Sequence, residues 1–199
     1  MTATRSFIIF AIFIILATNS GVNCAPLTPQ NDQIVQLIQA LYTHPWPGAE
    51  IVGTPMTWAF HFTAPMQALL EIGPAAQQPL LAKLFDTRIV DQAIILLGGV
   101  GDERSVGPMI LAMQRASALP EEQRKRTLQA GNVALTNITV ADVIWHHGGG
   151  IILDRCPDDP GRCWAAWWEQ HKATFRVRDI TQSRRYSNYP NYGIYHNLK

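Results

Sequence analysis

The sequence predicts an all-α protein in which helices stack in pairs, as in a short α-solenoid. Within residues 66–113 an apolar helix, a glycine-containing turn and a second amphipathic helix occur twice in succession. Equivalent residues of the two units are separated by nearly the same number of positions. The spacing from Gly73 to Gly101 is almost equal to that from Pro79 to Pro108. A period of roughly 30 residues that is built from paired helices is typical of repeat architectures. The composition, 47% hydrophobic and 16% charged, is that of a folded domain.

Residues 1–25 have the layout of a secretory signal peptide. Arg5 forms a short positive region, and an unbroken apolar run follows over 7–17. As a helix this run covers roughly 17 Å, whereas a spanning helix crosses roughly 30 Å of hydrocarbon. Two alternatives stay open: an N-terminal membrane anchor extended to Val22, and lipidation at Cys24. The residues allow cleavage at three points, after Ser20, after Cys24 or after Ala25.

The charge balance disfavours non-specific nucleic-acid binding. The net charge of the 199-residue chain is +1, and without residues 1–25 there are 15 basic and 15 acidic side chains. Non-specific nucleic-acid binding usually comes with an excess of basic side chains, which this body does not have. We therefore expect an exported protein, periplasmic or extracellular, with no nucleic-acid partner. Membrane contact is expected only through the N-terminal segment, if that segment is retained.

After a short linker, the sequence predicts a helix over 31–41, which Asn31 or Asp32 can cap. Its inward positions recur every three or four residues, at Ile34, Leu37, Ile38 and Leu41. Prolines and a glycine then end it, at Pro45, Pro47 and Gly48. Residues 50–62 carry Pro55 and several aromatic residues, so we expect either an irregular cover over the first repeat or a short helix.

The first helix pair is expected to begin at Thr63, which can cap a helix with Pro65 in its first turn. Gly73 suits the reversal that follows, because glycine tolerates the left-handed conformation at a helix end. The second helix of the pair is expected over 74–85. The residues predicted to face inward in this pair are Met66, Leu69, Leu70, Ala76, Leu80, Leu84 and Phe85.

The second helix pair is expected to begin at Asp86 or Thr87, and its second helix at Asp102. The inward stripe of the first helix is predicted at Val90, Ala93, Ile94 and Leu97, and that of the second at Val106, Met109, Ile110 and Met113. A further helix opens at Pro120, and its early acids Glu121 and Glu122 suit the positive end of the helix dipole. This helix ends near Thr139 and carries Leu128, Ala134 and Leu135.

The stretch QAIILLGGVGDERSVGPMILAM resembles the short HEAT-like repeats first recognised in phycobilisome lyases. The resemblance covers residues 64–139 and implies stacked helical hairpins, while it implies no particular function. Residues 135–175, which end in CWAAWWEQHKATF, also resemble the closing module of exported bacterial HEAT-repeat proteins. We therefore expect one domain over 31–178, a right-handed stack with capping segments over 31–62 and 140–178.

Cys156 and Cys163 are expected to form a disulfide, since they remain as an even pair in an oxidising compartment. The alternative is a metal-dependent binder or enzyme that uses the region from His146 to Cys163, including His147. Structural zinc sites favour cysteines two to four residues apart, and six residues separate these two. No metal, cofactor or catalytic residue is therefore expected, and no Ser lies in a Gly-x-Ser-x-Gly context.

Three tryptophans follow at helical spacing, Trp164, Trp167 and Trp168. Such a stripe indicates core packing, although one ring can face outward as a platform for a sugar or a peptide. Residues 179–199 form a polar, tyrosine-rich tail. It is expected either to be disordered or to dock along a neighbour through Tyr186, Tyr189, Tyr192 and Tyr195.

The function predicted is that of a non-catalytic protein-binding or scaffold protein. Stacked helix pairs form a concave face, which the second helix of each pair is expected to line. The solvent-side residues predicted there are Gln77, Gln78, Lys83, Arg104, Gln114 and Arg115. Such a face is polar and mildly basic, so we expect a protein partner, or the tyrosine-rich tail of the same or a neighbouring chain.

Overall fold

The computed structural model describes residues 29–52, 57–139 and 159–175, with the backbone alone described in the strands over 49–52 and 57–60. These residues are mainly helical, as the sequence predicts, and contain one short β-hairpin. The elements are α1 (Pro29–Leu41), β1 (Ala49–Val52), β2 (Thr57–Phe60), α2 (Ala64–Ile72), the 3₁₀ helix η1 (Gly73–Ala76), α3 (Gln77–Leu81), α4 (Val90–Val100), α5 (Glu103–Arg115), the 3₁₀ helix η2 (Ala116–Ala118), α6 (Glu121–Thr139) and α9 (Pro160–His171).

Helix α4 lies at the centre of the fold, where it contacts α2, α3, α5 and α6. The predicted inward stripe of this helix is buried, and so are Ile95 and Leu96 on its other sides. A helix that is apolar all round is stable only when neighbours cover every side of it. The helices around α4 therefore form a single core.

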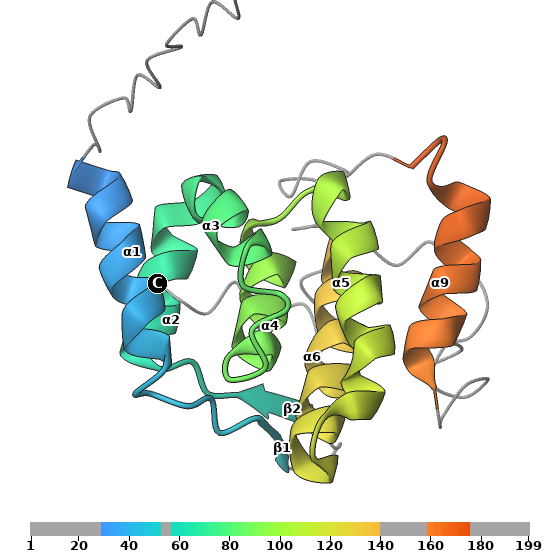
Figure 1. Ribbon diagram of the computed structural model, residues 1–199, viewed down its shortest axis with the longest axis horizontal. Coiled ribbons are helices and arrows are strands. Elements are labelled where there is room, and N and C mark those ends of the chain that lie inside the picture. Colours follow the sequence, from blue (N-terminus) through green and yellow to red (C-terminus); the bar gives the residue numbers. More distant parts are fainter. Residues whose placement is uncertain (1–28, 53–56, 140–158, 176–199) are drawn as a thin grey trace, which may run out of the picture.

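The contacts between helices arrange them in two rows. Figure 1 shows the helices following one another along the longest axis, from α1 at one end to α9 at the other. The first row is α2, α4 and α6, and the second row is α1, α3 and α5; each helix packs against the next member of its row. Helices α4 and α6 run in the same direction. Arg126 pairs with Asp91 near the starts of α6 and α4, and the Asn137 amide donates to the Gly98 carbonyl near their ends.

Helix α9 packs on α5 and runs antiparallel to it. A β-carbon added to Gly161, at the start of α9, would lie 3.3 Å from the backbone nitrogen of Gln114 near the end of α5. A β-carbon added to Gly107, near the start of α5, would lie 3.3 Å from Nε1 of Trp168. The second row therefore ends in an antiparallel helix.

The predicted turn and start signals are met in part. Gly73 ends α2 with a φ of 73°, which glycine tolerates, but its ψ of −141° lies outside the left-handed helical conformation that the sequence predicts. Asp102 caps α5, because its carboxylate accepts the backbone N–H of Arg104 at 2.9 Å. Helix α2 begins after Thr63, but the Thr63 hydroxyl makes no capping bond. Pro65 occupies the second helical position and removes one of the N–H groups that such a cap would bind.

Two expectations about the repeats are wrong. Neither Asp86 nor Thr87 caps α4, which instead begins after Ile89. Phe85 is 50% exposed instead of inward-facing. The helix expected over 74–85 is shorter than predicted, because α3 ends at Leu81, so the helical periodicity that predicts an inward Phe85 does not extend to that residue.

Residues 49–60 also differ from the prediction of an irregular cover or a short helix. Strands β1 and β2 pair antiparallel, with Ala49 opposite Phe60 and Val52 opposite Thr57. Four residues link the strands, within the range of ordinary hairpin loops.

Candidate functional site

The six residues predicted to bind a partner lie on or just after α3 and on α5, which are neighbours in the second row. Gln78, Arg104, Gln114 and Arg115 are exposed, and Lys83 is half-buried. Gln77 is the exception, because only 3% of it is exposed. The sequence-based placement of Gln77 on the solvent side is therefore wrong.

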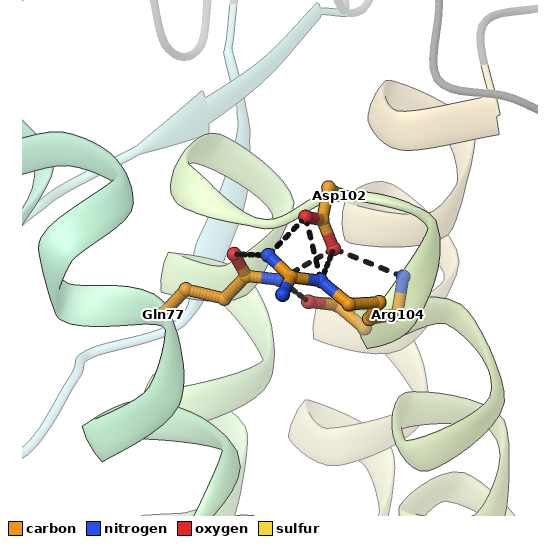
Figure 2. Close-up of polar contacts among 4 residues, drawn as sticks. Gln77, Asp102 and Arg104 are labelled. Carbon is orange, nitrogen blue, oxygen red and sulfur yellow. Dashed lines mark hydrogen bonds and ion pairs between the residues drawn. The ribbon is translucent and has the colours of Figure 1, made fainter.

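Gln77 is buried because its amide reaches across to the start of α5 (Figure 2). Its Nε2 donates to Asp102 Oδ1 at 2.6 Å and to the buried Ser105 Oγ at 3.0 Å. Arg104 Nη2 donates in return to Gln77 Oε1 at 3.4 Å. This network fixes the position of α3 beside α5, so Gln77 contributes to the packing of the face and not to its surface.

Arg104 is exposed, but its charge is already paired. Its Nη2 and Nε lie 2.6 and 2.9 Å from Asp102 Oδ2. The hydrogen bonds from Arg104, with a further one from Gln77, hold the pKa of Asp102 below its usual value. A partner's carboxylate would have to compete with Asp102 for this guanidinium, so Arg104 is a weaker candidate contact than Arg115.

A second polar cluster joins the end of α1 to the segment after α3. The Tyr42 hydroxyl donates to Asp86 Oδ2 at 2.5 Å. Arg88 binds the same carboxylate with two nitrogens, Nε at 3.1 Å and Nη2 at 3.0 Å, and its guanidinium carbon lies 4.4 Å from the centre of the Tyr42 ring. The hydrogen bond from Arg88 first, and that from Tyr42 next, hold the pKa of Asp86 well below its usual value. Asp86 is therefore ionised at neutral pH.

Two other cations of this region lie over aromatic rings. The guanidinium carbon of Arg115 is 4.6 Å from the centre of the half-exposed Phe85 ring, and Lys83 Nζ is 5.9 Å from that of Tyr42. Among the described residues, neither cation makes an ion pair. Both distances are within the range of attraction between a cation and an aromatic face.

We call the residues Tyr42, Lys83, Phe85, Arg88 and Arg115 the aromatic–cation row. They cross from the end of α1, through the segment after α3, to the end of α5. Sequence reasoning named only Lys83 and Arg115 among them. The repeat contains a signal for one further member, because Phe85 and Arg115 stand about one period apart, which puts them at equivalent positions of the two units.

The tryptophans of α9 are largely core residues. Trp164 is fully buried and donates to Asn132 Oδ1 at 3.1 Å. Trp167 and Trp168 are half-buried; the Trp167 ring stacks on His171 with 4.6 Å between ring centres, and Phe175 packs edge-on against both tryptophans. The three rings therefore do not form an open platform of the kind a sugar stacks on.

The alternative site between His146 and Cys163 falls mostly outside the described residues. Of this segment the structure describes only the part from Asp159 to Cys163. The predicted Cys156–Cys163 disulfide also falls outside the described residues, because Cys156 is not among them. The tyrosine-rich tail over 179–199 and the segment over 1–25 lie outside them too. Where the structure is described, His, Cys, Asp and Glu side chains nowhere gather in threes that could hold a metal ion.

The chain matches no protein-family model, and no curated protein or solved structure is significantly similar to it. No helix within 29–52, 57–139 or 159–175 combines the length and hydropathy needed to cross a bilayer.

Proposed function

We propose that this chain is a non-catalytic protein-binding protein with a HEAT-like array, and that it binds a protein partner through the exposed side of α3 and α5. The observation that carries the proposal is that Gln78, Gln114 and Arg115 are exposed on two helices that pack side by side. Rows of neighbouring helices offer such side chains as one continuous surface, which is how helical-repeat proteins bind extended partners.

The contacts between α3 and α5 favour a surface of fixed shape. Gln77 joins the helices at one end, and the Phe85–Arg115 contact joins the region at the other. A preorganised surface binds with a smaller loss of conformational entropy. This fits a docking surface better than it fits a site that must close on a substrate.

Site-specific photo-crosslinking in the native cell tests this function. A photoreactive amino acid at Gln114 of the full chain should yield a discrete product with one protein. The matched control is the same amino acid at Glu71, which is exposed on α2 in the first row. A discrete product from Gln114 and none from Glu71 is expected. Absence of any product from Gln114, or equal products from both positions, would overturn the proposal.

We also propose that the protein is exported, with residues 1–25 acting as a signal peptide or an anchor, and that Cys156 and Cys163 are then bonded. Closing an eight-residue loop stabilises the fold by roughly 2–3 kcal/mol in the chain-entropy model. Mass spectrometry of the mature protein after non-reducing digestion checks both points. Two free thiols would reject the disulfide, and an intact N-terminus in a soluble cytoplasmic fraction would reject export.

A further inference from the structure

We propose that Lys83, Phe85 and Arg115 bind an acidic segment of the protein partner, in which carboxylates flank an apolar side chain. This inference rests on the proposed function and specifies the chemistry of the partner. It replaces the general expectation of a polar, mildly basic surface with three residues that have distinct tasks.

The charge argument comes from the ion pairs. Of the cations near the ends of α3 and α5, Arg88 is held by Asp86 and Arg104 by Asp102. Lys83 and Arg115 have no carboxylate partner among the described residues. A partner's carboxylate is attracted to these two cations by opposite charge. It does not have to compete there with a carboxylate from the described residues.

The apolar argument comes from Phe85. Its ring is 50% exposed, although it is one of the largest apolar side chains in the chain. The Arg115 guanidinium lies over the ring and is thereby oriented before a partner arrives. An oriented guanidinium can bind a carboxylate with two parallel hydrogen bonds, while the uncovered part of the ring accepts an apolar side chain.

The position of Arg115 has a structural benefit of its own, because a cation in the last turn of α5 is favoured by the helix dipole. That benefit requires neither an exposed phenyl ring beneath the guanidinium nor a second cation at Lys83. The three features together favour binding of an acidic segment over helix stabilisation alone.

Other macromolecules fit the surface less well. Nucleic acids and anionic membranes are bound through many closely spaced cations. The proposed contact instead uses two cations, Lys83 and Arg115, and the Asp86 carboxylate is bound to the same tyrosine that Lys83 covers. Two cations and one aromatic ring match a short acidic and apolar protein segment in size and charge.

The experiment is the photo-crosslinking assay at Gln114, repeated on the full chain with charge variants. Arg115→Glu and Lys83→Glu should each reduce the yield of the product at least about five-fold, and raising the salt concentration to about 0.5 M should weaken it in the unmodified protein. Phe85→Ala should reduce it by a similar factor. One variant should leave the yield unchanged: Lys172→Glu, just after α9, where the lysine pairs with Glu169. It makes the same change in net charge as Arg115→Glu.

Circular dichroism and thermal melting of each variant identify any loss of yield that is due to unfolding. Where Arg115→Glu unfolds the protein, Arg115→Gln provides the same test with a smaller perturbation. A product whose yield ignores Arg115, Lys83 and salt overturns the acidic-segment proposal, while the protein-binding function stands. A product that a nuclease destroys also overturns it. A chain that gives no product at all contradicts the proposed function itself, so the two failures are distinguishable.

Discussion

Met113 of α5 lies so close to the backbone of Gly131 in α6 that no side chain fits between them. A β-carbon added to Gly131 would lie less than 3.0 Å from Sδ, Cγ and Cε of Met113, which is itself buried. The glycine therefore sets the distance between the two helices, and replacing it has a predictable cost.

Gly131→Ala should destabilise the fold by about 1 kcal/mol. Overpacking a core costs roughly 1–3 kcal/mol, and the better helix propensity of alanine offsets up to about 1 kcal/mol of that. In a Met113→Ala background the same substitution should be neutral or stabilising, because the clash is gone. Urea denaturation of the four proteins in this cycle measures the coupling. Equal effects of Gly131→Ala in both backgrounds would contradict the contact.

Gln77 and Gln78 are adjacent, but replacing them with alanine should change the free energy of unfolding by different amounts. Gln77→Ala should lower the free energy of unfolding by about 1–2 kcal/mol, because the buried Ser105 hydroxyl and the Asp102 carboxylate each lose a hydrogen-bond donor. Gln78→Ala should change it by less than about 0.5 kcal/mol, since Gln78 is exposed. Chemical denaturation of both variants checks the difference, and equal effects would show that the buried network contributes nothing.

Stability should fall at acid pH through Asp86. Folding lowers the pKa of this carboxyl group, so the unfolded chain takes up its proton first as the pH falls. The contribution is therefore complete well above the unfolded-state pKa of about 3.9 and declines as the pH falls through and below it. Asp86→Asn and Arg88→Gln should both reduce stability at pH 7. The loss should be modest, because solvent screens the exposed guanidinium. Both variants should also show a smaller decline of stability as the pH falls. Denaturation curves from neutral to acid pH provide the measurement; an unchanged slope in both variants would rule out this pair as the source.

The ion pair between Arg126 and Asp91 should matter more than an exposed one, because Asp91 is buried. Arg126→Met leaves the carboxylate without its cation and should cost about 1–3 kcal/mol, below the full value for a buried pair since Arg126 is partly exposed. Arg124→Met is the matched control two residues earlier in α6, where the side chain is exposed. Thermal denaturation compares the two. Similar melting temperatures would mean that Asp91 is stabilised by other groups.

Local signals in the sequence were sufficient for some boundaries and not for others. Asp102 starts α5 and Gly73 reverses the chain after α2, because a carboxylate cap and a glycine with positive φ are determined by nearby backbone alone. The hairpin was missed because Pro55 and the aromatic residues around it suggested irregular backbone. A glycine and a proline between two short apolar runs, at Gly53 and Pro55, are also a turn signal between strands.

The surface of the candidate site could not be predicted to the same degree. The placement of Gln77 toward solvent considered only the periodicity of its own helix, whereas α5 covers that side. Phe85 and Asp86 lie beyond the end of α3, where the chain changes direction and helical periodicity no longer applies. Such positions depend on how neighbouring helices are rotated, which tertiary packing decides.

The burial of α4 sets a lower limit on the size of the folding unit. Of its residues 90–100, only Gly99 is more than slightly exposed. In a long repeat array a terminal unit can be removed and the remainder keeps its fold, because each unit contacts only the next. Here a fragment that ends before α6 would leave α4 with an uncovered apolar side in water. Shortening the chain by one helix pair at a time should therefore not yield stable intermediates, and the helices around α4 should fold and unfold together.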